Sequence, residues 1–211
     1  MPAPGNRLTL IWRRYNAPMD FLNTLPTPLT EPSRRFFSIW HGWRGNRLLP
    51  ERQDINHDEL GALSDGCILL NVRGHDDILV EWVGRTVTSQ IGVNLTGCNY
   101  LDLTSKANRS WRAHLTMAQM AQPCSVAIYY FLRLGSGGML PVEIVTGPLR
   151  ENDASAATLI LCCATGLLPT DERPAVDPDS YEEGEGLVFI DIGAGVPPMN
   201  PAQRQGARAI Q

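Results

Sequence analysis

The chain has 211 residues, of which 43% are hydrophobic and 19% are charged, and its formal net charge is -4. This length suits one domain with extended ends, and the apolar content is enough for a folded core. A nucleic-acid partner is not expected, because such proteins carry a basic surface that displaces phosphate counterions.

The cysteine pattern indicates reduced thiols in a cytoplasmic protein. The number of cysteines is odd, and they form neither a CxxC pair nor the Cys/His spacing of a zinc site. We therefore expect no metal. No apolar stretch reaches the roughly 20 residues that span a bilayer, so we expect no integral membrane segment. The five cysteines are Cys67, Cys98, Cys124, Cys162 and Cys163.

The first regular element is expected to be a helix that begins near residue 30. Thr30 is a suitable N-cap, Pro32 falls in the first turn, and Gly45 can end the helix in a left-handed conformation. Aromatic residues between these positions recur at helical spacing. Residues 1–29 are rich in proline and show no sustained period, so they are predicted to form a flexible arm.

The remaining elements are expected to be two strands, short helical pieces, one longer helix and three more strands. The longer helix begins near Thr104 or Ser105 and stops at Pro123. This order favours an α+β domain in which helices pack on an antiparallel sheet. The strands are predicted at 67–72, 78–83, 124–134, 139–149 and 157–167.

The composition changes after residue 168. Between positions 171 and 186 the chain holds seven acidic residues and one basic residue, which predicts a solvated segment. The apolar run at 187–192 could form an extra edge strand or bind another chain. The expected division is an arm at 1–29, a domain at 30–168 and an acidic, Pro/Gly-rich tail at 169–211. The residues after 167 are too few for an output domain.

Spaced aromatics, glycines and prolines over about residues 34–167 resemble a bacterial family of single-domain PAS proteins. The resemblance implies a PAS fold, in which a five-stranded antiparallel sheet curls around a small cavity and helices pack on one face, here with an added N-terminal helix. It also implies a sensor or regulatory role without catalysis. The residues that carry it include Trp43-Arg44-Gly45, Leu49-Pro50, Arg52, Glu81-Trp82-Val83-Gly84-Arg85, Leu95-Thr96-Gly97 and Tyr100-Leu101-Asp102-Leu103.

Three features invite a chemical role, and each has a simpler interpretation. Cys98 precedes Asn99, whereas flavin-binding light-oxygen-voltage domains place the reactive cysteine after an asparagine. His114 lies on the longer helix, from which some haem-binding PAS domains present an axial ligand, but a lone helical histidine is more often a surface or packing residue. The adjacent Cys162 and Cys163 point to opposite faces of a strand and are favoured as structural thiols. We therefore expect no cofactor.

Two groups of residues are candidates for function. The leading hypothesis is a stand-alone sensor or adaptor that forms a homodimer and acts on a separate signalling protein, with an interface on the first helix at Phe36, Phe37, Trp40 and Trp43. The alternative is a receptor that binds haem, flavin or a metabolite in the PAS cavity. The cavity candidates are Ile68, Leu70, Trp82, Leu101, Trp111, Leu115, Ile128, Ile144 and Leu161.

Overall fold

The computed structural model describes residues 29–104, 106–133, 139–165 and 181–198. Nearly all of the expected N-terminal arm lies outside these residues, as do residues 134–138 and the parts of the acidic tail at 169–180 and 199–211.

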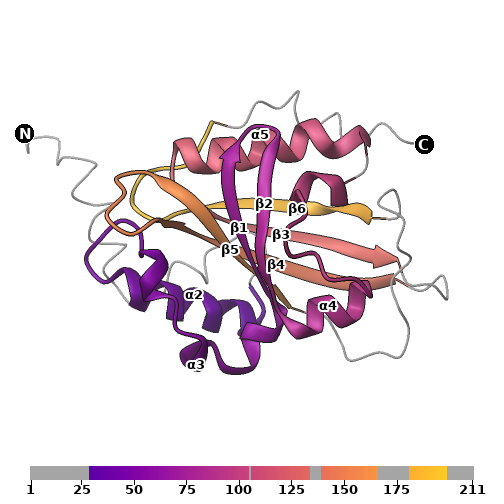
Figure 1. Ribbon diagram of the computed structural model, residues 1–211, viewed down its shortest axis with the longest axis horizontal. Helices are drawn as coiled ribbons and strands as arrows, with labels where there is room; N and C mark the ends of the chain where they lie inside the picture. The colour runs from indigo at the N-terminus through magenta and orange to yellow at the C-terminus, as the bar shows by residue number, and fades with distance from the viewer. Residues whose placement is uncertain (1–28, 105, 134–138, 166–180, 199–211) are drawn as a thin grey trace, which may run out of the picture.

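The structure is an α+β fold built on one antiparallel sheet of six strands in the order β2-β1-β5-β4-β3-β6 (Figure 1). The five expected strands are all present, and their bounds differ by only a few residues from the predicted ones. Consecutive strands β1 and β2 form a hairpin, and β3, β4 and β5 form a meander. The strands are β1 (Cys67–Gly74), β2 (Asp77–Val83), β3 (Cys124–Arg133), β4 (Met139–Arg150), β5 (Ala157–Thr165) and β6 (Tyr181–Asp191).

The sixth strand corrects the expectation of five. Strand β6 contains most of the apolar run at 187–192 and pairs antiparallel with β3, from Cys124 opposite Asp191 to Leu132 opposite Tyr181. Of the two alternatives for this run, the structure shows the edge strand. Without β6, strand β3 would leave its outer backbone groups unpaired, which is unfavourable at a sheet edge.

The helices begin and end where local residues satisfy their free backbone groups. The helix α2 (Glu31–Arg44) has Thr30 as its N-cap, whose side chain accepts a hydrogen bond from the backbone of Ser33, and Gly45 follows at φ 54°. The other α-helices are α3 (His57–Leu60), α4 (Arg85–Ile91) and α5 (Lys106–Ala121), and short 3-10 turns occur at Arg52–Asp54, Gly61–Gly66 and Tyr100–Leu103.

The helices cover both faces of the sheet. Helix α2 lies against one face, called the α2 face below, whereas α5 lies against the other, the α5 face (Figure 1). The side chain of Trp40 sits on Gly147 of β4 so closely that a Cβ at Gly147 would come within 2.4 Å of the indole ring. Trp40 also donates a hydrogen bond from Nε1 to the carbonyl of Pro148 at 3.1 Å. The missing side chain at Gly147 thus lets α2 approach the sheet.

The predicted interface on the first helix is wrong, because its aromatic side chains are buried in their own chain. The sequence reasoning counted only one core, beneath one helix layer. The sheet has a second face to cover, and α2 supplies its aromatic residues to that face. The exposed fractions are 0% for Phe36, 1% for Phe37, 0% for Trp40 and 9% for Trp43.

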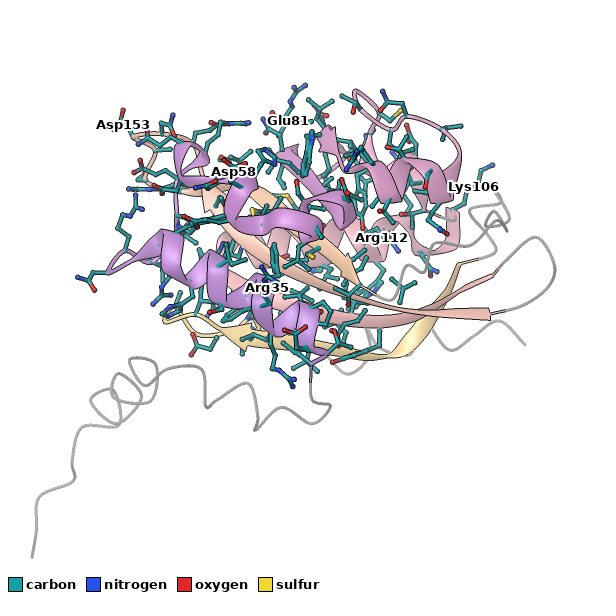
Figure 2. All side chains as sticks on the ribbon, turned by 90° about the horizontal axis from the view of Figure 1, so that it is seen from below. Arg35, Asp58, Glu81, Lys106, Arg112 and Asp153 are labelled. Carbon is teal, nitrogen blue, oxygen red and sulfur yellow. The ribbon has the colours of Figure 1, made fainter. Side chains whose placement is uncertain are left out.

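Ion pairs of one arginine with two glutamates connect the segment after α2 to the sheet. Arg52 contacts Glu81 of β2 at 2.7 Å and Glu151, in the turn after β4, at 2.6 Å. Arg150 pairs in turn with Glu51. Glu81 is labelled in Figure 2. The Leu49-Pro50 and Arg52 motif therefore has a structural explanation, since it ties this segment to two parts of the sheet.

Candidate functional site

The α2 face is closed at its centre. Cys67 of β1 lies opposite Cys163 of β5, Cys163 lies opposite Val145 of β4, and Val145 lies opposite Ala127 of β3. All four side chains have an exposed fraction of 0%. This row belongs to the core that also contains the aromatic residues of α2.

The α5 face is partly open at the same place in the sheet. There each of the six strands contributes one partly exposed apolar side chain, and we call this set the cross-sheet row. Its members are half-buried, although four of them stand on internal strands, where a packed helix layer would cover them completely. The cross-sheet row has two parts that are offset by two residues where β1 meets β5, because Ile68 lies opposite Cys162 there. One part is Val83 and Ile68, and the other is Ala164, Ile144, Ile128 and Leu187.

Residues of the cross-sheet row are chain neighbours of the closed row. Ile68 follows Cys67, Ala164 follows Cys163, and the other two pairs are likewise adjacent in the chain. Because neighbouring side chains in a strand point to opposite faces, each of these residues faces away from its neighbour in the closed row. The difference in exposure therefore comes from the covering layers and not from the strands.

The layer over the α5 face covers the neighbouring line of side chains more completely. Leu70 and Ile160 are 2% exposed, Val80 is 0% exposed and Cys162 is 8% exposed. Leu101 and Ala113, from the helical layer, complete this second core, and Ile68 and Ile144 pack against it from the cross-sheet row. The cross-sheet row thus lies at the edge of the core of the α5 face, where side chains remain partly exposed.

A positive charge from α5 reaches this border. Arg112 is half-buried, and its Nη1 donates a hydrogen bond to the hydroxyl of Tyr100 at 3.0 Å. Its guanidinium carbon lies 5.3 Å from the centre of the Tyr100 ring, a cation–π distance. The charge of Arg112 also acts on the thiol of Cys162, which lies opposite Ile68 in the sheet. Arg112 is labelled in Figure 2.

The buried thiols are held in their neutral form. Burial raises the pKa of Cys162 to about 12, with the neighbouring Cys163 adding to the rise and Arg112 opposing it. Burial and the nearby Asp191 also raise the pKa of Cys124 to about 12. Reactive thiols need a depressed pKa and exposure, so these cysteines have the properties of packing residues.

The structure divides the nine predicted cavity residues between the two faces. Ile68, Leu70, Leu101 and Ile144 belong to the core of the α5 face, and Ile128 lies opposite Ile144 on the same face. Trp111 and Leu115 are half-buried on α5. The five strand and turn residues therefore share one face of the sheet, and whether the nine residues line a cavity stays a prediction.

Trp82 and Leu161 were placed on the wrong face by the sequence reasoning. Both pack in the core of the α2 face. Leu161 alternates with Ile160 and Cys162, so it must point away from them. A β-bulge between β1 and β2 pairs Leu69 with Trp82 but Leu70 with Val80, which turns Trp82 to the opposite face.

The residues considered for flavin and haem chemistry are at the surface. Cys98 is exposed. The side chain of Asn99 accepts from the backbone of Leu101 and donates to the carbonyl of Asp76, so it fastens a turn. His114 is exposed on α5. These two side chains of the flavin and haem hypotheses, Cys98 and His114, do not point into the core of the α5 face.

Within the described residues, no group of three or more His, Cys, Asp or Glu side chains could hold a metal ion. In the same part of the chain, none of the helices combines the length and apolar character that a membrane crossing requires.

The fold is an antiparallel sheet that carries helices over an apolar core on each face. The family model for the PAS domain matches residues 29–164, more than half of the chain, and the chain belongs to this family. PAS domains have sensory and signalling roles, so this chain is a signalling domain by class. The matched residues end before β6. No curated protein matches the sequence.

Sequence reasoning missed four residues of this site. Ala164 and Leu187 lie near the ends of expected strands, where the sequence does not show what covers them. Val83 reaches the α5 face only because of the β-bulge before Trp82. Arg112 follows the apolar Trp111 on α5, and a cation among the apolar positions of that helix was the signal that could have found it.

Proposed function

We propose that this chain is a PAS-type sensor whose input is a small apolar molecule held between the cross-sheet row and helix α5. The observation that carries the proposal is the contrast between neighbours in the same strands. Val145 is 0% exposed on the α2 face, whereas the adjacent Ile144 is half-buried on the α5 face. Apolar surface at the centre of a sheet is a usual feature of small-molecule sites.

The burial pattern favours a small molecule over a protein segment as the occupant. The side chains of the cross-sheet row are half-buried, so each offers only part of its apolar surface to a partner. A site of this kind suits a molecule of a few carbon atoms, which would cover the remaining apolar area at about 25 cal/mol per Å². The proposal does not include haem or flavin, because Cys98 and His114 lie outside this region.

The isoleucines of the chain provide the test. Methyl spectra of isoleucine-labelled protein are recorded as the neutral probe 1-octanol is added. We expect the methyl signals of Ile68, Ile128 and Ile144 to shift, and those of Ile190 and Ile192, buried in the other core, to stay in place. An absence of shifts at the first three, or equal shifts at all five, would contradict the proposal.

A filling variant sharpens this test. Ile144→Trp places a larger side chain on the cross-sheet row and should reduce the affinity for 1-octanol at least about tenfold. The matched control is Val93→Trp, which adds the same side chain at a position that is 49% exposed. Equal octanol affinity in the two variants would argue against a site at Ile144.

Association with other chains remains part of the proposal in a modified form. We propose that the protein dimerises and passes its signal, without catalysis, to a separate signalling protein in the cytoplasm. The five free cysteines support a reducing compartment. Since the aromatic residues of α2 are buried, the contact must use another surface. Sedimentation velocity over a wide concentration range tests the dimer, and a monomer at every concentration would contradict it.

A further inference from the structure

We infer that Cys67 and Cys163 form a reversible disulfide between β1 and β5 when the protein meets hydrogen peroxide. This modification gives the domain a second input, separate from the molecule proposed for the α5 face. The basis is the position of the two thiols, which lie directly opposite each other in neighbouring antiparallel strands and belong to the core of the same face.

The pairing of the strands brings the two cysteines within bonding reach. Directly opposite residues of an antiparallel pair have Cα atoms about 4.5 or 5.5 Å apart, depending on whether they exchange backbone hydrogen bonds. A disulfide needs a Cα separation of about 4.4–6.8 Å, so both arrangements allow the bond without a movement of the strands. The two side chains also interact, since a hydrogen bond with Cys163, together with burial, raises the pKa of the Cys67 thiol.

The backbone shows that the two cysteines form a pair without mutual hydrogen bonds. The N–H of Gly84 donates to the carbonyl of Cys67 at 2.8 Å, so Cys67 directs its backbone groups towards β2 and away from Cys163. Pro148 of β4, opposite Ile160, has no N–H to donate, so Ile160 directs its groups to β1 and Cys163, three residues later, directs its groups to β4. Such a pair lies near the lower limit of separation for a disulfide, and a strained disulfide is more easily reduced.

All five cysteines lie in the described residues, and no other two of them are placed in this way. Cys162 and Cys163 are neighbours in β5 and point to opposite faces. Cys124 stands on β3, with β4 between it and β5, and Cys98 is exposed outside the sheet. An oxidant that links two thiols within the folded chain is therefore expected to link Cys67 to Cys163.

The oxidation balances with one molecule of hydrogen peroxide. A thiolate gives two electrons to the peroxide, the O–O bond breaks, and a sulfenic acid forms while the released hydroxide takes up the thiol proton as water. The second thiol attacks the sulfenic sulfur, the S–S bond forms, and the S–O bond breaks with release of a second water molecule.

Burial determines which oxidant can act and how fast. Cys67 and Cys163 are both 0% exposed, so the oxidant must be small and uncharged to reach them. The raised pKa keeps Cys67 protonated at rest, and the thiolate is the form that reacts. The pair therefore oxidises more slowly than an exposed thiol and responds to lasting oxidation.

The experiment uses the full chain with Cys98→Ser, which removes the exposed thiol and leaves four of the five cysteines. The folded protein is kept with excess hydrogen peroxide for several hours, freed of peroxide with catalase, unfolded and labelled with N-ethylmaleimide. Mass spectrometry counts the labels, and the peptides are mapped without reductant. We expect two labels where the untreated protein takes four, a linked peptide pair that contains Cys67 and Cys163, and four labels again after reduced glutathione.

Variants assign the link to this pair. Cys67→Ser and Cys163→Ser, each in the same background, should abolish the linked peptides, and Cys124→Ser, which removes another buried thiol, should retain them. The peptide map of the Cys98→Ser protein decides the inference even where a further variant folds poorly. Four labels after treatment, a link between other cysteines, a loss of labels without a link, or a link that glutathione does not reduce would overturn it.

Discussion

The two faces of the sheet both carry apolar side chains, but these side chains differ in how completely they are buried. On the α2 face, Cys67, Cys163, Val145 and Ala127 form a row with 0% exposure. On the α5 face, one chain neighbour of each of these residues is half-buried, namely Ile68, Ala164, Ile144 and Ile128. Helix α2 is fitted closely to its face, as the contact of Trp40 with Gly147 shows, whereas the cross-sheet row on the α5 face is partly accessible.

This difference indicates a division of labour within one small domain. The closed face gains the packing contacts of three fully buried aromatic side chains, and such contacts supply much of the stability of a domain. The partly open face gives up some of that packing. Apolar surface without a covering partner is unfavourable in water, which makes the α5 face the place where a bound molecule would add stability.

The largest effect is expected at the contact between α2 and the sheet. Trp40→Ala removes a fully buried ring and its hydrogen bond to Pro148, and should lower the free energy of unfolding by about 3–5 kcal/mol. Ile144→Ala, on the partly open face, should cost about 1–2 kcal/mol, because less buried surface is lost. Urea denaturation measures both values, and equal losses would show that the two faces are packed alike.

The fit of Trp40 to the sheet gives a second comparison. Gly147→Ala places a methyl group within 2.4 Å of the indole and should destabilise the protein by about 1–3 kcal/mol through overpacking. Gly74→Ala is the control, since a Cβ at this other strand glycine meets nothing within 4 Å. Thermal unfolding followed by tryptophan fluorescence compares the two variants. A Gly147→Ala protein as stable as Gly74→Ala would mean that α2 is not closely seated.

The buried thiols predict a loss of stability at alkaline pH. Burial raises the pKa of Cys162 from 9.0 to about 12, so the folded protein retains a proton that the unfolded chain releases. This contribution is complete below about pH 9 and decreases as the pH rises towards 12. At about pH 10.5 the stability lost in this way is about 1–2 kcal/mol relative to neutral pH, and the Cys162→Ala variant should not show this loss.

Chemical denaturation at pH 7.5 and pH 10.5 measures this alkaline effect. The exposed Cys98 supplies the control, because Cys98→Ala should leave the pH dependence as it is in the wild type. If the two alanine variants lose stability equally between these pH values, Cys162 is not protected by its position in the core.

The smallest effect is expected where the segment after α2 meets the sheet. Arg52→Gln removes the ion pairs with Glu81 and Glu151 and should cost about 1 kcal/mol, since these side chains are partly exposed. Their pairing with Arg52 lowers the pKa of Glu151, and it also lowers that of Glu81 against the opposing effect of burial. The stabilisation is therefore present above their ordinary pKa of 4.5 and is lost as the pH falls.

Denaturation of the wild type and Arg52→Gln at several acidic pH values tests this prediction. The two stabilities should converge as the pH falls through the lowered pKa values of Glu81 and Glu151, because protonated carboxyl groups no longer form ion pairs with Arg52 in the wild type. A difference that does not change with pH would show that Arg52 acts through packing and not through its charge.

Much of the fold could be predicted from local signals. Thr30 and Gly45 mark the ends of α2 by capping, and all five strands of the PAS sheet follow from alternation and turn residues. What local signals leave open is which face a strand residue takes after a bulge. Trp82 shows this, since one extra residue opposite Leu69 and Leu70 reverses its direction.

The candidate site could be predicted only in part, for a physical reason. Alternation places Ile68, Ile128 and Ile144 on a common face, but exposure depends on how closely a distant helix fits over them. That fit is decided by contacts far apart in the chain, such as Trp40 on Gly147. For the same reason, the aromatic residues of α2 resembled an unpaired surface in the sequence although the second face of the sheet buries them.

The most direct test of the account compares Ile144 with Val145, adjacent residues on opposite faces. A soluble nitroxide is added to methyl-labelled protein, and relaxation enhancement is measured at both residues with and without saturating 1-octanol. We predict strong enhancement at Ile144 that octanol reduces, and almost none at Val145 in either state. Equal enhancement at the two residues, or enhancement at Ile144 that octanol leaves unchanged, would contradict a ligand site on the α5 face.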